Sequence, residues 1–148
     1  MKHSSLLLLS IVLSACASAP VPTPDTLDPH RAAQHFFQPI FSPMDCELVG
    51  RAGKGEIEDH FAALYFFLDR SHDRIINRAE FDNAQFNASP LEKDFIFSHM
   101  DANGDGQVTP QEYMQFAYYA FDLLDTNQDG DLTDTEVDMQ SFRKAPKS

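Results

Sequence analysis

The chain has 148 residues, a length that suits one domain, and a formal net charge of −12. No basic stripe runs along it, so it is not expected to bind nucleic acid through the phosphates. The acidic balance is instead typical of a protein that binds cations. Thirteen Phe and no Trp predict a phenylalanine-rich core.

Residues 1–15 are predicted to be a signal peptide that takes no part in the fold. A short basic start precedes an apolar run over 6–13, which is too short to span a membrane. The run ends in Leu-Ser-Ala-Cys, which resembles the lipobox of bacterial lipoproteins. The resemblance implies acylation of Cys16 and, because Ala17 and not Asp follows it, sorting in a Gram-negative host to the outer membrane, with the domain facing the periplasm. The alternative is an ordinary signal peptide that is cut after another small residue, such as Ala19.

Residues 16–28 comprise the lipidated Cys and a tether, in which three prolines and no apolar period favour an extended chain. The domain is expected over 29–148. Asp28 followed by Pro29 is typical of a helix N-cap and first helical position. Apolar residues then recur at helical spacing as far as Met44, although two prolines within this stretch are expected to bend or shorten the helix.

An internal repeat organises the rest of the chain. Ile-Phe-Ser-Pro-Met-Asp at 40–45 matches Ile-Phe-Ser-His-Met-Asp at 96–101, with an offset of 56 residues. Because the offset carries forward without a gap, each half contains two twelve-residue segments with a helix between them. The four segments begin at Asp45, Asp69, Asp101 and Asp125.

The first segment, 45–56, keeps acidic residues at positions 1, 3 and 12 and Gly50 at position 6. Val49 at position 5 and a glycine at position 9 offer no side-chain oxygen, so the segment is expected to be a structural relic. It also contains Cys46, which has no disulfide partner if Cys16 is acylated. Cys46 is expected to be a small buried residue or a free thiol.

The second segment, 69–80, has oxygen donors at positions 1, 3, 5, 7, 9 and 12: Asp69, Ser71, Asp73, the backbone carbonyl of Ile75, Asn77 and Glu80. Arg74 stands at position 6, where the other segments have glycine, and a left-handed backbone there costs about 1–2 kcal/mol. Three arginines also cancel the three acids of the segment. It is therefore expected to be a partly degenerate and weaker site.

The third and fourth segments carry the complete pattern, with Gly106 and Gly130 at position 6 and net charges of −3 and −5. Their donors at positions 1, 3, 5, 7, 9 and 12 are Asp101, Asn103, Asp105, Gln107, Thr109 and Glu112, and Asp125, Asn127, Asp129, Asp131, Thr133 and Glu136.

This spacing resembles the calmodulin-type EF-hand loop, which wraps about six to eight oxygens around one Ca²⁺. The resemblance implies an all-α EF-hand helical domain with four loops, two intact, one partly degenerate and one relic, that arose by internal duplication. It also implies Ca²⁺ as the cofactor, with position 7 contributing its backbone carbonyl.

Helices are predicted between the loops. Phe61, Leu64, Tyr65 and Leu68 share one helical face, as do Tyr113, Phe116, Ala117, Ala120, Phe121 and Leu124. Thr109 and Thr133, each followed by Glu three residues on, are typical helix starts. A further helix is expected from Pro90 to about Met100, with Leu91, Phe95 and Ile96 facing inward.

Loop pairing follows from helix length. Only twelve residues, about 18 Å of helix, separate loops 101–112 and 125–136, so these two lie at opposite ends of one rod and cannot pair. Loop 69–80 is expected to pair with 101–112, and 45–56 with 125–136. This layout resembles that of the lanmodulin family, whose four loops share helices. That family has Pro at loop position 2 and Asp at position 9, and because this sequence has neither, Ca²⁺ is expected in preference to a lanthanide.

Other chemistry is not expected. The histidines form no close zinc pair, and each is expected at the surface or at a helix cap: His30, His35, His60, His72 and His99. No glycine-rich phosphate loop or nucleophile elbow is present, and the loops account for most carboxylates, so the protein is not expected to be an enzyme.

The sequence therefore predicts a lipid-anchored bacterial envelope protein that binds Ca²⁺. The protein would act as a calcium sensor or buffer, or as a module that Ca²⁺ stabilises and that binds an envelope protein. The alternative is a periplasmic binder of another metal: a lanthanide, Mn²⁺ or Mg²⁺. Contact with the membrane is expected only through the N-terminal lipid.

Overall fold

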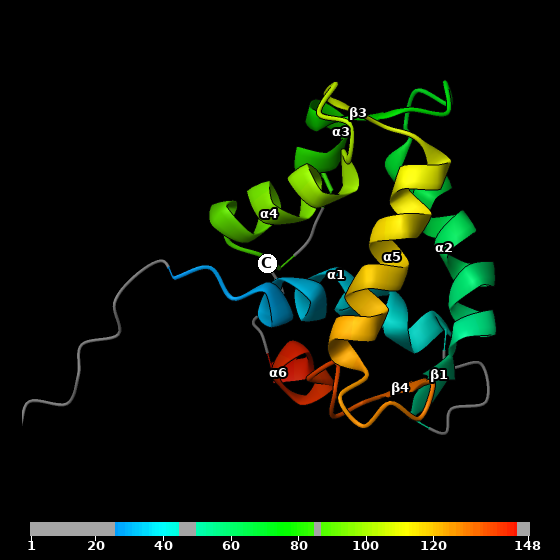
Figure 1. The fold of residues 1–148 in the computed structure, drawn as a ribbon, viewed down its shortest axis with the longest axis vertical. Helices are drawn as coiled ribbons and strands as arrows, with labels where there is room; N and C mark the ends of the chain where they lie inside the picture. Colours follow the sequence, from blue (N-terminus) through cyan, green and yellow to red (C-terminus); the bar gives the residue numbers. More distant parts are fainter. Residues whose placement is uncertain (1–25, 45–49, 85–86, 145–148) are drawn as a thin grey trace, which may run out of the picture.

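The computed structural model describes residues 26–44, 50–84 and 87–144. The predicted signal peptide, Cys16, most of the tether and Cys46 lie outside these ranges. Within them the chain is mostly helical (Figure 1). The elements are α1 (Pro29–Met44), β1 (Arg51–Gly53), α2 (Lys54–Leu68), β2 (Ile76–Asn77), α3 (Arg78–Asp82), α4 (Pro90–Met100), β3 (Gln107–Val108), α5 (Pro110–Leu124), β4 (Asp131–Thr133) and α6 (Met139–Lys144). No helix in the described ranges has the length and apolar character needed to span a membrane.

Helix α1 begins as predicted. Asp28 Oδ1 accepts a hydrogen bond of 3.0 Å from the backbone N–H of His30, and Pro29 is the first helical residue. The prolines do not shorten the helix, which continues for 16 residues to Met44, so that part of the expectation is wrong. Burial of its apolar face outweighs the lost backbone hydrogen bonds. The residues of that face are Ala32, Ala33, Phe36, Phe37, Ile40 and Phe41.

The core lies where α1 packs against α2, α4 and α5. The Phe36 ring stacks on Phe61 of α2 at 5.8 Å between centroids and meets Phe116 of α5 edge-on at 5.0 Å. All six residues predicted for the inner face of α5 are buried, and of the four predicted for α2 only Leu64 is half-buried instead. The expected phenylalanine-rich core is confirmed.

Helix α4 has the predicted bounds, with Ser89 as its N-cap and Pro90 as its first residue. Phe95 and Ile96 are buried as expected, but Leu91 is 38% exposed and its predicted inward position is wrong. Glu92 takes the inward place in the first turn, because the side chains of α1 offer it ionic partners there.

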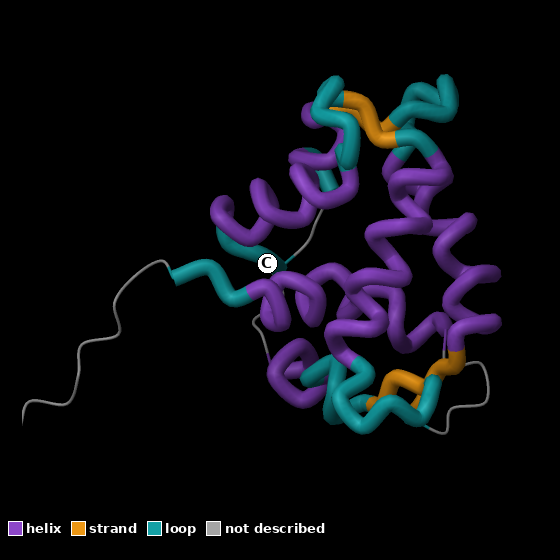
Figure 2. The backbone as a smooth tube through the Cα atoms, in the orientation of Figure 1, coloured by secondary structure: helices purple, strands orange, loops and turns teal. Residues whose placement is uncertain are grey.

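Two short antiparallel ladders stand at opposite ends of α2 and α5, as Figure 2 shows. β1 pairs with β4, with Ala52 opposite Leu132, and β2 pairs with β3, with Ile76 opposite Val108. These four side chains are fully buried. The predicted pairing of loop 45–56 with 125–136, and of 69–80 with 101–112, is confirmed. Each of α2 and α5 therefore connects a loop at one end of the domain with a loop at the other.

Candidate metal-binding loops

Three loops leave their helices in the same way. Asp69, Asp101 and Asp125 directly follow α2, α4 and α5, and each backbone N–H closes the last helical turn. Their φ and ψ angles are −74° and 80°, −74° and 73°, and −69° and 76°. The first residue of each loop is thus aimed by the end of a rigid helix.

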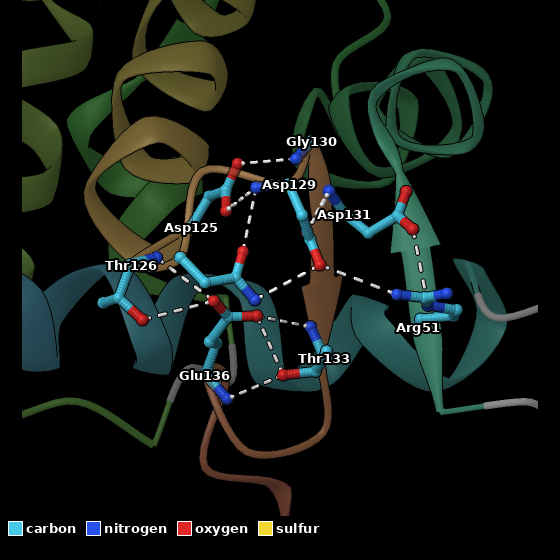
Figure 3. A network of polar contacts seen from close by, with 9 residues as sticks. Arg51, Asp125, Thr126, Asp129, Gly130, Asp131, Thr133 and Glu136 are labelled. Atoms are coloured by element: carbon cyan, nitrogen blue, oxygen red, sulfur yellow. Dashed lines mark hydrogen bonds and ion pairs between the residues drawn. The ribbon is translucent and has the colours of Figure 1, made fainter.

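The position 1 carboxylate holds each loop closed from within. Its two oxygens accept hydrogen bonds from the backbone N–H groups of positions 5 and 6. For Asp69 these bonds measure 3.2 and 2.8 Å, for Asp101 3.0 and 2.8 Å, and for Asp125 3.2 and 3.0 Å. Three segments of different composition therefore adopt one hydrogen-bond scheme, which Figure 3 shows for Asp125.

The position 12 glutamate closes the other side. Glu80, Glu112 and Glu136 each accept a hydrogen bond of 2.9–3.0 Å from the backbone N–H of position 9. Glu80 and Glu136 also accept one from the start of the loop, donated by Ser71 at 2.9 Å and Thr126 at 3.1 Å. In loop 45–56 the backbone N–H of Gly53 at position 9 donates the same bond to Glu56 at 2.9 Å, and the first five positions of that loop lie outside the described residues.

These hydrogen bonds keep Glu80 and Glu112 ionised. The backbone N–H of Thr109 holds the pKa of Glu112 below its usual range, against the opposing effect of burial, with help from Ala102 and Asn103 across the loop. Burial acts to raise the pKa of Glu80, but the bonds from Asn77 and Ser71 lower it overall. Both side chains are therefore carboxylates at neutral pH.

Position 6 is left-handed in all four loops. The φ angles are 75° at Gly50, 79° at Gly106, 85° at Gly130 and 69° at Arg74, which confirms the conformation expected for Arg74. Position 4 is also left-handed, with φ of 58°, 74° and 59° at His72, Gly104 and Gln128, a feature the sequence analysis missed. Among these three residues, only Gly104 is of a type that indicates a left-handed backbone from the sequence.

The exits of the two acidic loops differ. Thr109 caps α5 with the predicted capping box. Thr133 and Glu136 make the same reciprocal bonds, but the helix they start lasts only one turn. Asp138, with φ of 54°, ends it, and the N–H of Met139 bonds the carbonyl of Asp134 at 2.9 Å. The predicted helix start at Thr133 is thus only a turn, and α6 begins at Met139.

Tyr65 joins the paired loops 69–80 and 101–112. Its hydroxyl lies 2.7 Å from the carbonyl oxygen of Arg74 and 3.1 Å from that of Val108. Burial, together with the nearby loop carboxylates, raises the pKa of Tyr65 to about 12, so the hydroxyl remains a donor. A residue predicted only for the core therefore also bridges the two loops.

Arg51 is a charged partner that the sequence analysis missed. From β1 it reaches the acidic loop opposite, with Nη2 3.6 Å from Asp129 Oδ2 and Nε 3.3 Å from Asp131 Oδ2 (Figure 3). The relic loop thus supplies a cation to the most acidic loop. The predicted pairing of these loops was the signal that could have found it.

The donor chemistry fits a hard cation. The predicted side-chain ligands are carboxylate, amide and hydroxyl oxygens, which suit Ca²⁺ or Mg²⁺ better than zinc or copper. In the described ranges no three His, Cys, Asp or Glu side chains are gathered as a metal-binding group.

His35 does not lie at the surface as predicted. Its side chain is 13% exposed, and Nδ1 lies 3.2 Å from Glu92 Oε2.

Comparison with known protein families gives a match over one of these loops. The family model described as EF hand matches residues 93–117, which span most of α4, the whole of loop 101–112 and the first half of α5. No curated protein and no solved structure matches the chain. The match identifies this helix–loop–helix unit as an EF hand, which indicates binding of a divalent cation, typically Ca²⁺.

Proposed function

We propose that this protein is a Ca²⁺-binding protein and not an enzyme, with metal sites in loops 101–112 and 125–136 and a weaker site in 69–80. One observation carries the proposal. Loops 69–80 and 125–136 repeat the hydrogen-bond scheme of loop 101–112, which lies in the matched EF hand. Because the backbone scheme is the same, the oxygens at positions 1, 3, 5, 7, 9 and 12 become equivalent candidates in all three loops.

Each loop contributes to binding through its own residues. The position 1 Asp is fixed by the preceding helix, and the position 12 Glu is fixed by the first turn of the structure that follows. Ca²⁺, when bound, supplies the positive charge that offsets the repulsion among the clustered carboxylates. The loop carboxylates already accept backbone N–H bonds, which hold them close to their loops.

The shared helices support a four-loop domain of internally duplicated, lanmodulin-like layout. α2 runs from the relic loop to 69–80, and α5 runs from 101–112 to 125–136. Loops at opposite ends of the domain therefore share one packed helix. The lack of Pro at position 2 and of Asp at position 9 supports Ca²⁺ over lanthanides.

We further propose the order of signal peptide 1–15, lipidated Cys16 with a tether to residue 28, and domain 29–148. Its support is the lipobox-like sequence and the cap at Asp28. The protein is then an outer-membrane lipoprotein facing the periplasm. There it acts as a calcium sensor or buffer, or as a calcium-stabilised module for an envelope protein.

The test is a calorimetric Ca²⁺ titration of the metal-free full chain in detergent, with far-ultraviolet circular dichroism before and after. Two strong sites and one weaker site are expected. Glu112→Gln, Glu136→Gln and Glu80→Gln should each abolish a different one, while Glu58→Gln, on the exposed face of α2, should abolish none. Absence of heat in the wild-type chain would refute calcium binding and lead to titrations with Mn²⁺, Mg²⁺ and a lanthanide. Mass spectrometry of the wild type and Cys16→Ser tests the acyl chains.

A further inference from the structure

The last turn of α2 exposes two phenylalanines. Phe66 is 67% exposed and Phe67 is 79% exposed, the highest values among the large hydrophobic residues of the described ranges. The helix buries Ile57, Phe61, Tyr65 and Leu68, so the two phenylalanines lie off its core-facing side. Neither ring is required to fill the core, and their exposure marks a contact surface.

Two arginines and a histidine follow this pair within the next seven residues. Arg70, His72 and Arg74 are all exposed, and the His72 ring lies 5.1 Å from the Phe66 ring. Both phenylalanines, Arg70 and His72 line one shallow hollow, and Phe66 and His72 also line a second one together with Arg74. In the described part of the chain, no carboxylate lies within ion-pair distance of Arg70 or Arg74, whereas Arg31, Arg51, Arg78 and Arg143 are all paired.

This combination fits an anionic lipid surface. Aromatic rings are favoured at the boundary between lipid head groups and acyl chains, and arginines beside them can reach the phosphates. The chain as a whole carries −12, so an anionic surface meets less repulsion at this face than at the acidic loops. A soluble acidic protein would also satisfy the arginines and cover the two rings, so the preference for a lipid surface depends on the tether described next.

The length of the N-terminal segment adds a second argument. The described residues begin at Thr26. Given the proposed acylation of Cys16, the ten residues from Ala17 to Thr26 span at most about 35 Å, so the domain stays close to the bilayer. Confinement at that distance raises the effective concentration of lipid, and a face too weak to dock from solution then docks.

We propose that Phe66, Phe67, Arg70 and Arg74 form a docking face for anionic phospholipid membranes, a second membrane contact beyond the N-terminal lipid that the sequence predicts. The two rings enter the interface and the two guanidinium groups contact lipid phosphates. Docking places the paired loops 69–80 and 101–112 next to the membrane surface, because the face immediately precedes and includes the start of loop 69–80.

The absence of Trp from the chain allows a direct test. Phe66→Trp in the full chain introduces a single reporter, and Tyr119→Trp provides a matched one on α5, where the Tyr119 ring stacks on His99 of α4. Each protein is mixed with vesicles of phosphatidylcholine, with or without phosphatidylglycerol. The reporter at position 66 should shift to the blue and be quenched by brominated acyl chains on the anionic vesicles. The reporter at position 119 should not.

Arg70→Gln with Arg74→Gln, added to the Phe66→Trp chain, should abolish the dependence on phosphatidylglycerol. No shift at position 66 on anionic vesicles would overturn the proposal, as would equal shifts at both positions. A shift without vesicles that grows with protein concentration would overturn it in favour of a second copy of the chain. Sedimentation with phosphatidylcholine vesicles reports the lipid anchor separately, so failure of the anchor is distinguishable from failure of the face.

Discussion

Replacement of Arg74 by glycine tests the assignment of loop 69–80 as a degenerate metal site. Arg74 has φ of 69° at a position where the other loops have glycine. The left-handed conformation costs a non-glycine residue about 1–2 kcal/mol. Glycine relieves this cost, but it also gives the unfolded chain more freedom, which lowers the stability by about 0.5–1 kcal/mol. We expect the unfolding free energy of metal-free Arg74→Gly to rise by about 0–1.5 kcal/mol.

The same substitution should strengthen metal binding at this loop, because its charge changes from neutral to −1. A unit charge about 8 Å from a divalent ion contributes about 1 kcal/mol in water, and moderate salt reduces that by about half. We therefore expect Ca²⁺ to bind loop 69–80 about 2–5-fold more tightly. Tyr65 contacts the backbone carbonyl of residue 74, so its bridge to Val108 should remain.

Urea unfolding of metal-free protein measures the first effect, and calorimetric titration measures the second. Two controls separate backbone from charge. Arg70→Gln removes the same charge without a left-handed residue, and should raise affinity without raising stability. Gly106→Ala adds a Cβ that meets nothing within 4 Å at φ of 79°, so by the same balance it should lose about 0–1.5 kcal/mol from backbone conformation alone. Clear destabilisation by Arg74→Gly, or unchanged affinity beside a gain in Arg70→Gln, would refute the reasoning.

Three further predictions concern contacts outside position 6. Arg51→Ala should tighten Ca²⁺ binding to loop 125–136 about 2–10-fold at low salt and less at high salt, because a cation next to Asp129 is lost; weaker binding in the titration would contradict this. Burial acts to raise the pKa of Glu92, but hydrogen bonds from Ser89 and the charges of His35 and Arg31 lower it overall. Ionised Glu92 therefore stabilises the fold fully above about pH 5, and this stabilisation is lost as the pH falls below that value. Urea unfolding in EDTA should show Glu92→Gln less stable at pH 7 and less sensitive to acid, and parallel pH profiles would contradict it. Tyr65→Phe should cost about 1–2 kcal/mol in thermal or urea unfolding, because the buried hydroxyl donates to loop carbonyls, and an unchanged midpoint would show that its bridge adds nothing.

Most of the secondary structure could be predicted from local sequence patterns. The capping pairs at Asp28, Ser89 and Thr109 mark helix starts that the structure has, because a cap acts within one turn of chain. The apolar face of α5 followed from spacing alone. Loop pairing was also predictable, because a helix of fixed rise between two loops leaves few partners for each.

The sequence by itself determined where the loops stand and which oxygens each one offers, since both depend on spacing within twelve residues. Only the tertiary structure decided how other elements act on them. The continuation of α1 through its prolines, the inward turn of Glu92 and the reach of Arg51 to Asp129 each depend on a partner far away in the chain. The exposure of Phe66 and Phe67 is of the same kind. Helical periodicity sets two residues apart from an inner face, but the neighbouring helices decide whether anything covers them.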